Sequence, residues 1–325
     1  MSRYNVRLFE VRLHEGQKRK DVPFEKAGAE HYAHVAERAL TALKGEKRYD
    51  DPPPEGAEVA TEDAIPPTRA LEVDDVVRAG SSLLIKFHAG AARDHDKALA
   101  MSEDRHDVDL LGLAPSRGYR AMLVLPSQGD LGVLAVEDVA RACPRDMVVK
   151  WLNAQVKRDA VSSGSTSWRI SIKPMTDLDQ LARLDRKSVE RVEFRKHGID
   201  RDGTTGQTGL AVTVSSGIDR SLGAKIKAKA KGWLGQTDVT DKLAARELAV
   251  LVGHNLEEVD FDDAWVVMSD EDVSMSKISP SRATDVFIYR IADTVPTDTA
   301  FARAAGDIAR RLMKARELSI EWPDW

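Results

Sequence analysis

The hydrophobic pattern is densest in residues 119–151, where two apolar runs flank a short polar turn. Residues 121–125 and 131–136 are each about the length of a strand, and Gly129 between them suits the positive φ of a tight hairpin turn. Both runs are apolar at nearly every position, which predicts strands covered on both faces. Pro144 then opens a predicted helix, because proline has no N–H to leave unpaired at a first helical position. We therefore expect a hairpin backed by its own helix at the centre of the fold.

Weaker patterns of the same kind predict the remaining elements. Alternating apolar residues indicate strands near residues 4–13, 83–87, 168–172, 189–194, 210–214, 265–268 and 286–291. Apolar residues at helical spacing indicate helices over residues 27–44, 147–158, 177–184, 218–233, 243–251 and 299–316. A slip in the first alternation predicts a bulge near Phe9, and Gly45 is a suitable end for the first helix. Because strands outnumber helices and do not alternate regularly with them, we predict an α+β fold with mainly antiparallel sheets and packed helices.

Polar stretches separate these elements. Residues 46–68 are rich in proline and acid, which predicts an extended tether or a loop laid over the surface. Residues 91–109 and 198–209 read as loops. The run SSGS at residues 162–165 is the strongest linker signal in the chain, and the pattern changes after it. The chain is therefore expected to form two lobes.

Composition narrows the class of protein. The chain has 325 residues, of which 42% are hydrophobic and 31% charged, which is typical of a globular protein with one large or two modest domains. A single cysteine, Cys143, cannot form an internal disulfide and indicates a reducing compartment. No apolar run approaches the roughly 20 residues of a membrane span, and the acids among the first residues are unlike a signal peptide. We expect a cytoplasmic protein.

Searches for catalytic chemistry give no motif. The patterns GxxxxGK[ST], GxGxxG, GxSxG and HExxH are absent from the sequence. Cys143 has no histidine near it in sequence that would activate a thiol nucleophile. Glu137 and Asp138 end a predicted strand, but the E-x-K type of partner that a metal-dependent nuclease would need does not follow. We predict no enzyme and no cofactor, and a nuclease is the least favoured alternative.

The candidate metal ligands also form no complete set. His31 and His34 are three residues apart on a predicted helix, but a site needs three or four ligands. A second candidate is the acidic loop that holds His95 and His106, which we interpret as a solvated loop. The segment DRDG at residues 200–203 resembles the start of a calcium loop but lacks the downstream acid. We predict no metal site.

Charge segregation is the most informative functional signal. The formal net charge is −5, so any nucleic-acid surface must be a local patch. Residues 219–233 hold five bases against one acid, residues 303–316 also have a net charge of +4, and residues 256–273 hold eight acids and no base. Basic helices can follow phosphates, with salt-dependent binding. The predicted DNA-binding residues are Arg220, Lys225, Lys227, Lys229, Lys231, Arg310, Arg311 and Lys314.

Two other interpretations of these charges remain open. A basic helix is often a solvated face, or it pairs with acids of its own or another subunit, which would make the chain a protein–protein interaction module. If residues 225–231 formed a strand instead of a helix, their four alternating lysines would all point one way and make a sharper patch.

The second half of the chain resembles the RexA family of phage-exclusion proteins. The resemblance rests on WRISIKPM (168–175), SVERVEF (188–194), the basic helix IDRSLGAKIKAKAKGWLG (218–235), FDDAWVVM (261–268) and the terminal helix. It concerns the order of elements, with few fixed identities. The first half, including VLPSQGDLGVLAVEDV (124–139), matches only in general layout.

This resemblance implies an intracellular, dimeric protein that binds double-stranded DNA without sequence preference and acts beside a RexB-like membrane partner. It also implies an architecture similar to the RdgC proteins, with residues 1–165 and 295–325 as the main lobe and residues 166–294 as an inserted, movable lobe. The expected function is a non-catalytic DNA-binding sensor of a phage-exclusion system. The acidic overall charge and the proline-rich segment 46–68 depart from that family's pattern.

Overall fold

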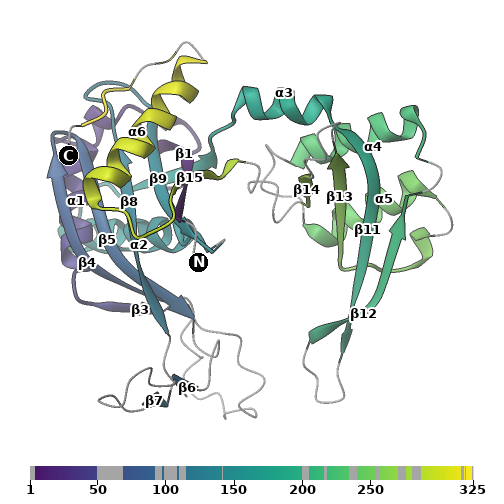
Figure 1. Ribbon diagram of the computed structural model, residues 1–325. Coiled ribbons are helices and arrows are strands. Elements are labelled where there is room, and N and C mark those ends of the chain that lie inside the picture. Colours follow the sequence, from purple (N-terminus) through teal and green to yellow (C-terminus); the bar gives the residue numbers. More distant parts are fainter. Residues whose placement is uncertain are drawn as a thin grey trace. The chain divides into compact units, whose positions relative to one another are not determined.

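The computed structural model of the chain forms two compact units (Figure 1). It describes residues 4–49, 69–91, 97–98, 108–109, 115–140, 142–199, 205–215, 218–233, 240–253, 256–269, 276–279, 287–315, 318, 320–323 and 325. Unit 1 consists of Met1–Lys173 and Tyr289–Trp325, and unit 2 is the continuous segment Pro174–Ile288 between them. No helix in these described ranges is long and apolar enough to cross a membrane.

Unit 1 is organised around a large sheet in the strand order β10-β1-β9-β8-β5-β4-β3, with β2 and β15 also paired to β1. The strands are β1 (Tyr4–Glu15), β2 (Asp21–Val22), β3 (Lys47–Tyr49), β4 (Arg69–Ala79), β5 (Ser82–Ala91), β8 (Ser116–Val124), β9 (Gly132–Val139), β10 (Trp168–Pro174) and β15 (Tyr289–Ala292). A separate pair is formed by β6 (Lys97–Ala98) and β7 (Val108–Asp109). The ladders from β3 to β9 and on to β1 are antiparallel, which confirms the predicted fold class.

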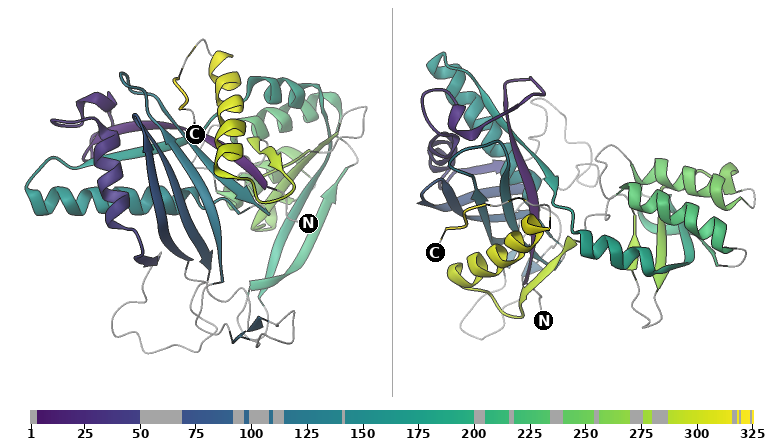
Figure 2. Two further views of the ribbon diagram at one scale, coloured as in Figure 1. Left: turned by 60° about the vertical axis from the view of Figure 1, so that its left-hand side comes forward. Right: turned by 90° about the horizontal axis from the view of Figure 1, so that it is seen from above.

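Helices cover both faces of this sheet. The short helix η1 (Phe24–Lys26), α1 (Tyr32–Ala42) and α2 (Arg145–Ser163) pack on one face, and α6 (Asp298–Lys314) lies on the other (Figure 2). All eight residues of β9 are buried as a result, which explains why the central strands are apolar on both faces. The predicted hairpin is confirmed: β8 pairs with β9, and Gly129 in the turn has a φ of 117°. Pro144 precedes the first turn of α2 as its N-cap, one residue before the predicted position.

Two local predictions in unit 1 are wrong. The register of β1 with β9 runs without a break from Tyr4 to Val11, so there is no bulge at Phe9; its neighbour Leu8 is also buried because both faces of the sheet are covered. The predicted linker at residues 162–165 is the end of α2, where Gly164 takes a left-handed conformation (φ 65°) as the C-cap. The Ser163 hydroxyl donates to the Asp159 carbonyl oxygen at 2.8 Å and completes this cap.

Unit 2 is a four-stranded sheet in the order β12-β11-β13-β14, with α4 and α5 on one face (Figure 2). Its elements are α3 (Leu178–Arg186), β11 (Ser188–Ile199), β12 (Thr205–Val214), α4 (Arg220–Trp233), α5 (Asp241–Val252), η3 (Leu256–Glu258), β13 (Asp263–Ser269) and β14 (Ser276–Ile278). Phe194 on β11 and Ala264 on β13 are opposite each other in register and fully buried. Ile226 of α4 and Leu248 of α5 are buried as well, so the core of unit 2 lies between its sheet and these two helices.

Several boundaries differ from those expected. The predicted division assigned residues 166–294 to the second lobe, whereas β10 and β15 pair within the large sheet of unit 1. The loop expected at residues 198–209 contains the last residues of β11 and the first of β12, with residues 200–204 outside the described ranges. Of the proline-rich stretch 46–68, only residues 46–49 are described, and they include β3. The alternative of a strand at residues 225–231 is wrong, because α4 is a helix there.

Candidate nucleic-acid interface

Helical geometry divides the predicted lysines of α4 between two sides of the helix. Ile226, Ala230 and Trp233 are buried against the sheet, which fixes how α4 is rotated. Residues two apart on a helix differ by about 200°, whereas residues four apart share a side. Lys225 and Lys229 therefore lie on the side of α4 that faces α5, and both line a groove there. Lys227 and Lys231 both reach Asp185 of α3 instead.

Three of these lysines have partners inside unit 2. The ammonium of Lys229 is 2.9 Å from a carboxylate oxygen of Glu247 on α5. Lys231 forms an ion pair with the Asp185 carboxylate at 2.7 Å, and Lys227 donates to the Asp185 carbonyl oxygen at 2.9 Å. All three contacts are partly exposed, so their net worth is about 0–1 kcal/mol each. They orient the lysines but leave them within reach of a competing anion.

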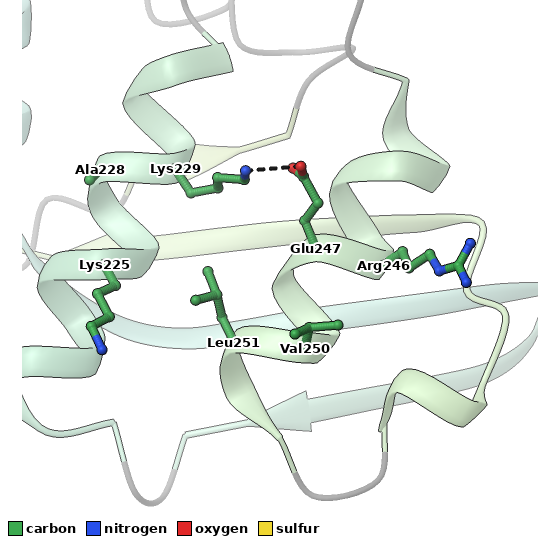
Figure 3. Close-up of a pocket in the computed structure, with 7 residues that line it drawn as sticks. All are labelled: Lys225, Ala228, Lys229, Arg246, Glu247, Val250 and Leu251. Atoms are coloured by element: carbon green, nitrogen blue, oxygen red, sulfur yellow. Dashed lines mark ion pairs between the residues drawn. The ribbon is translucent and has the colours of Figure 1, made fainter.

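An open groove separates α4 from α5, with a volume of about 760 Å³ (Figure 3). Its lining comes only from these two helices: Lys225, Ala228, Lys229, Arg246, Glu247, Val250 and Leu251. Lys229 and Glu247 face each other across it, and Leu251 projects from α5 into the space beside Lys225 (Figure 3). Three cations and one carboxylate thus surround an apolar floor, which gives the groove a formal charge of +2.

Two cations of this groove are unpaired. Within the described part of the chain, Lys225 and Arg246 have neither an ion pair nor a hydrogen bond, and both are exposed. Arg220 is also exposed, but it is seven residues before Lys227 and therefore lies on the side of α4 that faces away from the groove. Arg246 was not among the predicted DNA-binding residues, because its helix has no local excess of base in the sequence. The sequence predicts the helix over residues 243–251 that carries Arg246. Only the fold places that helix, and with it Arg246, beside α4.

The second predicted basic set lies in unit 1, at the end of α6. Arg310 forms an ion pair with Asp307 one turn earlier at 2.7 Å, and the Arg311 guanidinium lies 5.5 Å from the centre of the Tyr289 ring. Lys314 is exposed in the last turn. Bases in the last turn of a helix offset its negative end, which gives this set a structural role. The two predicted basic sets therefore belong to different compact units.

The acidic stretch 256–273 is described only as far as residue 269. Within that part, Asp260 pairs with Lys242 of α5 at 2.7 Å, which lowers the pKa of the aspartate because the ammonium donates a hydrogen bond to it. Asp263 accepts a hydrogen bond from the Trp265 indole at 3.2 Å. Both contacts lie within unit 2, as one of the two alternative interpretations of the charges expects, but Asp260 contacts α5 rather than α4, and Asp263 contacts its own strand.

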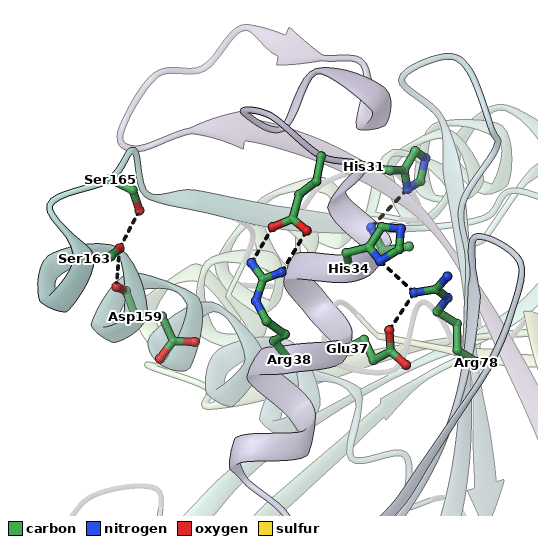
Figure 4. A network of polar contacts seen from close by, with 10 residues as sticks. His31, His34, Glu37, Arg38, Arg78, Asp159, Ser163 and Ser165 are labelled. Atoms are coloured by element: carbon green, nitrogen blue, oxygen red, sulfur yellow. Dashed lines mark hydrogen bonds and ion pairs between the residues drawn. The ribbon is translucent and has the colours of Figure 1, made fainter.

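The histidine pair on α1 is engaged in structural contacts (Figure 4). His31 is the N-cap of α1: its Nδ1 accepts from the Ala33 N–H at 3.1 Å, and its Nε2 donates to the Pro126 carbonyl oxygen at 2.9 Å. The Nδ1 of His34 lies 2.7 Å from Nη1 of Arg78, which also pairs with Glu37. Both ring nitrogens of His31 are occupied, so this histidine cannot coordinate a metal ion.

The two acids at the end of β9 point to opposite faces of the sheet. Glu137 is fully buried and bonds to Arg120, accepting its backbone N–H at 3.0 Å; burial raises the pKa of this carboxyl. Asp138 is also fully buried and pairs with Arg7 at 2.6 Å. Successive strand residues alternate between faces, so these two carboxylates cannot share a metal ion as a nuclease would need.

No metal cluster is found among the residues that the structure describes. The candidates at His95, His106 and residues 200–203 lie outside those residues. Burial raises the pKa of the Cys143 thiol to about 12, so almost none of it is thiolate at neutral pH and it is unsuited to nucleophilic attack. The nuclease alternative stays a prediction, which incubation of plasmid DNA with Mg²⁺ or Mn²⁺ would test.

Comparisons of the chain with protein-family models, with curated proteins and with solved structures found no match.

Proposed function

We propose that unit 2 binds the phosphate backbone of double-stranded DNA without sequence preference, along the side of α4 that faces α5. The observation that supports the proposal is the groove with a charge of +2, in which Lys225 and Arg246 form neither an ion pair nor a hydrogen bond among the described residues. Lysine and arginine contact phosphates through charge, and phosphate contacts carry no sequence information. No asparagine or glutamine lines the groove to read adenine edges.

The predicted DNA-binding residues of α4 would not contribute equally to this site. Lys225 and Arg246 would contact phosphates first, and Lys229 would join them by exchanging Glu247 for a phosphate. Arg220 lies on the side of α4 that carries Lys227 and Lys231, outside the groove. Lys227 and Lys231 are held by Asp185 and would contribute less. A surface with two unpaired cations predicts weak binding, with a salt slope of about −2 in a plot of log K against log salt for each copy of the chain. A role as a non-catalytic sensor in phage exclusion, beside a membrane partner, is the part of the proposal supported by the resemblance alone.

Fluorescence anisotropy of a labelled duplex, at low and moderate salt, tests this proposal. The variant Lys225→Glu/Arg246→Glu should lose binding to all sequences alike, because both unpaired cations of the groove are reversed. Lys157→Glu/Lys242→Glu is the matched control, since both are exposed lysines outside the groove and the same number of charges is reversed. Equal affinity of the double variant and the native chain would reject the site, and no binding by the native chain at low salt would reject DNA as the ligand.

One observation favours a second function, a protein–protein interaction module. Val250 is 64% exposed on the floor of the groove, beside the half-buried Leu251. An apolar floor between basic rims would suit an acidic amphipathic segment of another protein. Under this alternative Val250→Asp would abolish partner capture, whereas phosphate binding along the cationic rims would be reduced only slightly. Native chain that self-associates in a salt-sensitive way but never binds DNA would support the module.

A further inference from the structure

The edge strand β12 of unit 2 has a stretch, Leu210–Val214, that is open to pairing with another strand; the two register shifts between β12 and β11 lie before it. It lies at the end of the sheet order and pairs with β11 on one side only. Its ten residues, TGQTGLAVTV, include neither a charged residue nor a proline. Its register with β11 is unbroken from Leu210 to Val214. Along an antiparallel edge, alternate residues point their N–H and C=O away from the sheet, so this stretch offers donors and acceptors that no described strand of unit 2 accepts.

Three other edge strands that the structure describes, β14, β3 and β4, carry the features that normally prevent such pairing. At the opposite edge of the same sheet, β14 is three residues long and contains Lys277. In unit 1, β3 is also three residues long and contains two bases. Where β4 extends beyond β3 it carries Asp74, Asp75 and Arg78, and its register with β5 shifts between Val73 and Asp75. Of these four strands, β12 is thus the long edge without charges.

We propose that β12 pairs antiparallel with β12 of a second copy of this chain. A two-fold axis generates antiparallel pairing of a strand with itself, so each donor of one copy meets an acceptor of the other. A strand without charges brings no like charges together in this arrangement, whereas a copy of the Asp74–Asp75 edge would. The result is a continuous sheet of eight strands, four from each copy.

The side chains of β12 are compatible with this pairing. Val212 and Val214 are opposite the buried Phe194 and Val192, so they face the helices and the core. Ala211 and Thr213 point to the other face and are exposed. Charges at these two positions would therefore leave the core intact and crowd the new interface with like charges.

The symmetry has a consequence for the proposed DNA surface. The two-fold axis of an antiparallel strand pair is perpendicular to the sheet, so both copies keep their helices on the same face. The grooves between α4 and α5 of two copies would then share one face, with twice the number of cations. This consequence rests on the proposed function, whereas the pairing itself does not.

Sedimentation velocity over a range of concentrations tests the pairing without DNA. The native chain should be a dimer, and Ala211→Lys/Thr213→Lys should be a monomer with an unchanged circular dichroism spectrum. Val161→Lys/Ser162→Lys is the matched control, because both residues are exposed on α2 and it adds the same charge; it should remain a dimer. A monomeric native chain at every concentration, or a lysine variant that still dimerises, would overturn the proposal.

Distances between spin labels locate the two-fold axis and distinguish pairing through β12 from a dimer formed through another surface. Single cysteines at Ala211, Thr213 and Ser215, in a Cys143→Ser background, each place a label on the same edge of both copies. Equivalent labels move apart by about 13 Å along the strands for each two residues from the axis, since the rise is about 3.3 Å per residue. Three label-to-label distances that agree with one two-fold axis within β12 would support the pairing. Distances that agree with no such axis would overturn it.

Discussion

At the scale of single residues, the candidate site is decided by which carboxylates reach the lysines of α4. The row of lysines at every second position is evident in the sequence, but their partners are not, since Asp185 and Glu247 belong to other helices. In a helix, alternate lysines of that row lie on two sides, one toward α5 and one toward Asp185. A count of charges along the sequence cannot show this division. Sequence reasoning thus identified the basic residues and missed both the ion pairs and Arg246.

Releasing Lys229 from its partner should strengthen DNA binding. In Glu247→Gln the ammonium of Lys229 loses its carboxylate, and a surface pair of this kind costs little stability to remove. We expect severalfold tighter binding in the anisotropy assay and a salt slope steeper by about 0.9, which corresponds to one added phosphate contact.

Asp260→Asn is the matched control for this variant. It changes the net charge equally and releases Lys242, which lies outside the groove. If both variants tighten binding by the same factor, net charge rather than Lys229 is responsible.

The buried Glu137 gives a prediction about stability. Arg120 bonds to both Glu137 and Asp298, and in Arg120→Met the Glu137 carboxylate would be buried without a cation. Breaking a buried pair in this way lowers the free energy of unfolding by about 3 kcal/mol at neutral pH. Urea denaturation measures the change, and Arg117→Met, an exposed residue of the same strand, should cost little.

The cost of Arg120→Met should depend on pH. Burial raises the pKa of Glu137 in the folded state, so folding favours its protonated form, and its contribution to stability falls as pH rises from the ordinary carboxyl range through the raised pKa. Without Arg120 this pKa rises further. Asp298, whose pKa is lowered by its bonds to Lys86 and Arg120, loses one of these bonds as well. The variant should therefore lose least stability near pH 4 and most at pH 7, and a cost independent of pH would contradict this account.

At the scale of elements, the apolar pattern was informative wherever a strand or helix buries a face. The central hairpin and the helices α1 to α6 all have counterparts among the predicted segments. β4 was not predicted, because its sequence RALEVDDVVRA is polar where it lies at the edge of the sheet and is only partly buried. The SSGS run was taken for a linker because serine and glycine are common both in linkers and at helix ends.

Two helical glycines should respond in opposite ways to alanine. A Cβ on Gly232 of α4 would meet nothing within 4 Å, so Gly232→Ala should raise stability by about 0.5–1 kcal/mol through helix propensity. A Cβ on Gly306 of α6 would lie 2.7 Å from the Trp322 indole, whose Nε1 donates to the Ala302 carbonyl oxygen at 3.0 Å. Gly306→Ala should therefore destabilise the protein by about 1 kcal/mol or more, despite the same gain in propensity.

Thermal denaturation with tryptophan fluorescence measures both glycine variants. The emission of Trp322 should shift in Gly306→Ala, because its ring must leave the helix, and should stay unchanged in Gly232→Ala. Stabilisation by both substitutions would mean that Trp322 does not pack on α6.

At the scale of the whole molecule, pairing between distant segments decides what the sequence pattern leaves open. β10 and β15 were expected in the second lobe, but each pairs with β1, more than 150 residues away from either. The sheet that a strand joins depends on its partner strands and not on its own local sequence pattern. Unit 2 has 16 Lys and Arg against 20 Asp and Glu by its sequence, a net charge of −4, so its basic surface is visible only after the acids have been placed.

The pairing of β12 and the DNA surface together predict how binding depends on salt. Two copies with two unpaired cations each on one face should give a slope of about −4 in log K against log salt, and a single copy about −2. Ala211→Lys/Thr213→Lys should therefore lose close to half the slope of the native chain, although it adds positive charge on the opposite face of the sheet. The control Val161→Lys/Ser162→Lys should keep the native slope. If the monomeric variant keeps it as well, the two grooves do not act on one DNA molecule, and each copy binds alone. If both variants halve it, added charge and not the loss of pairing is the cause.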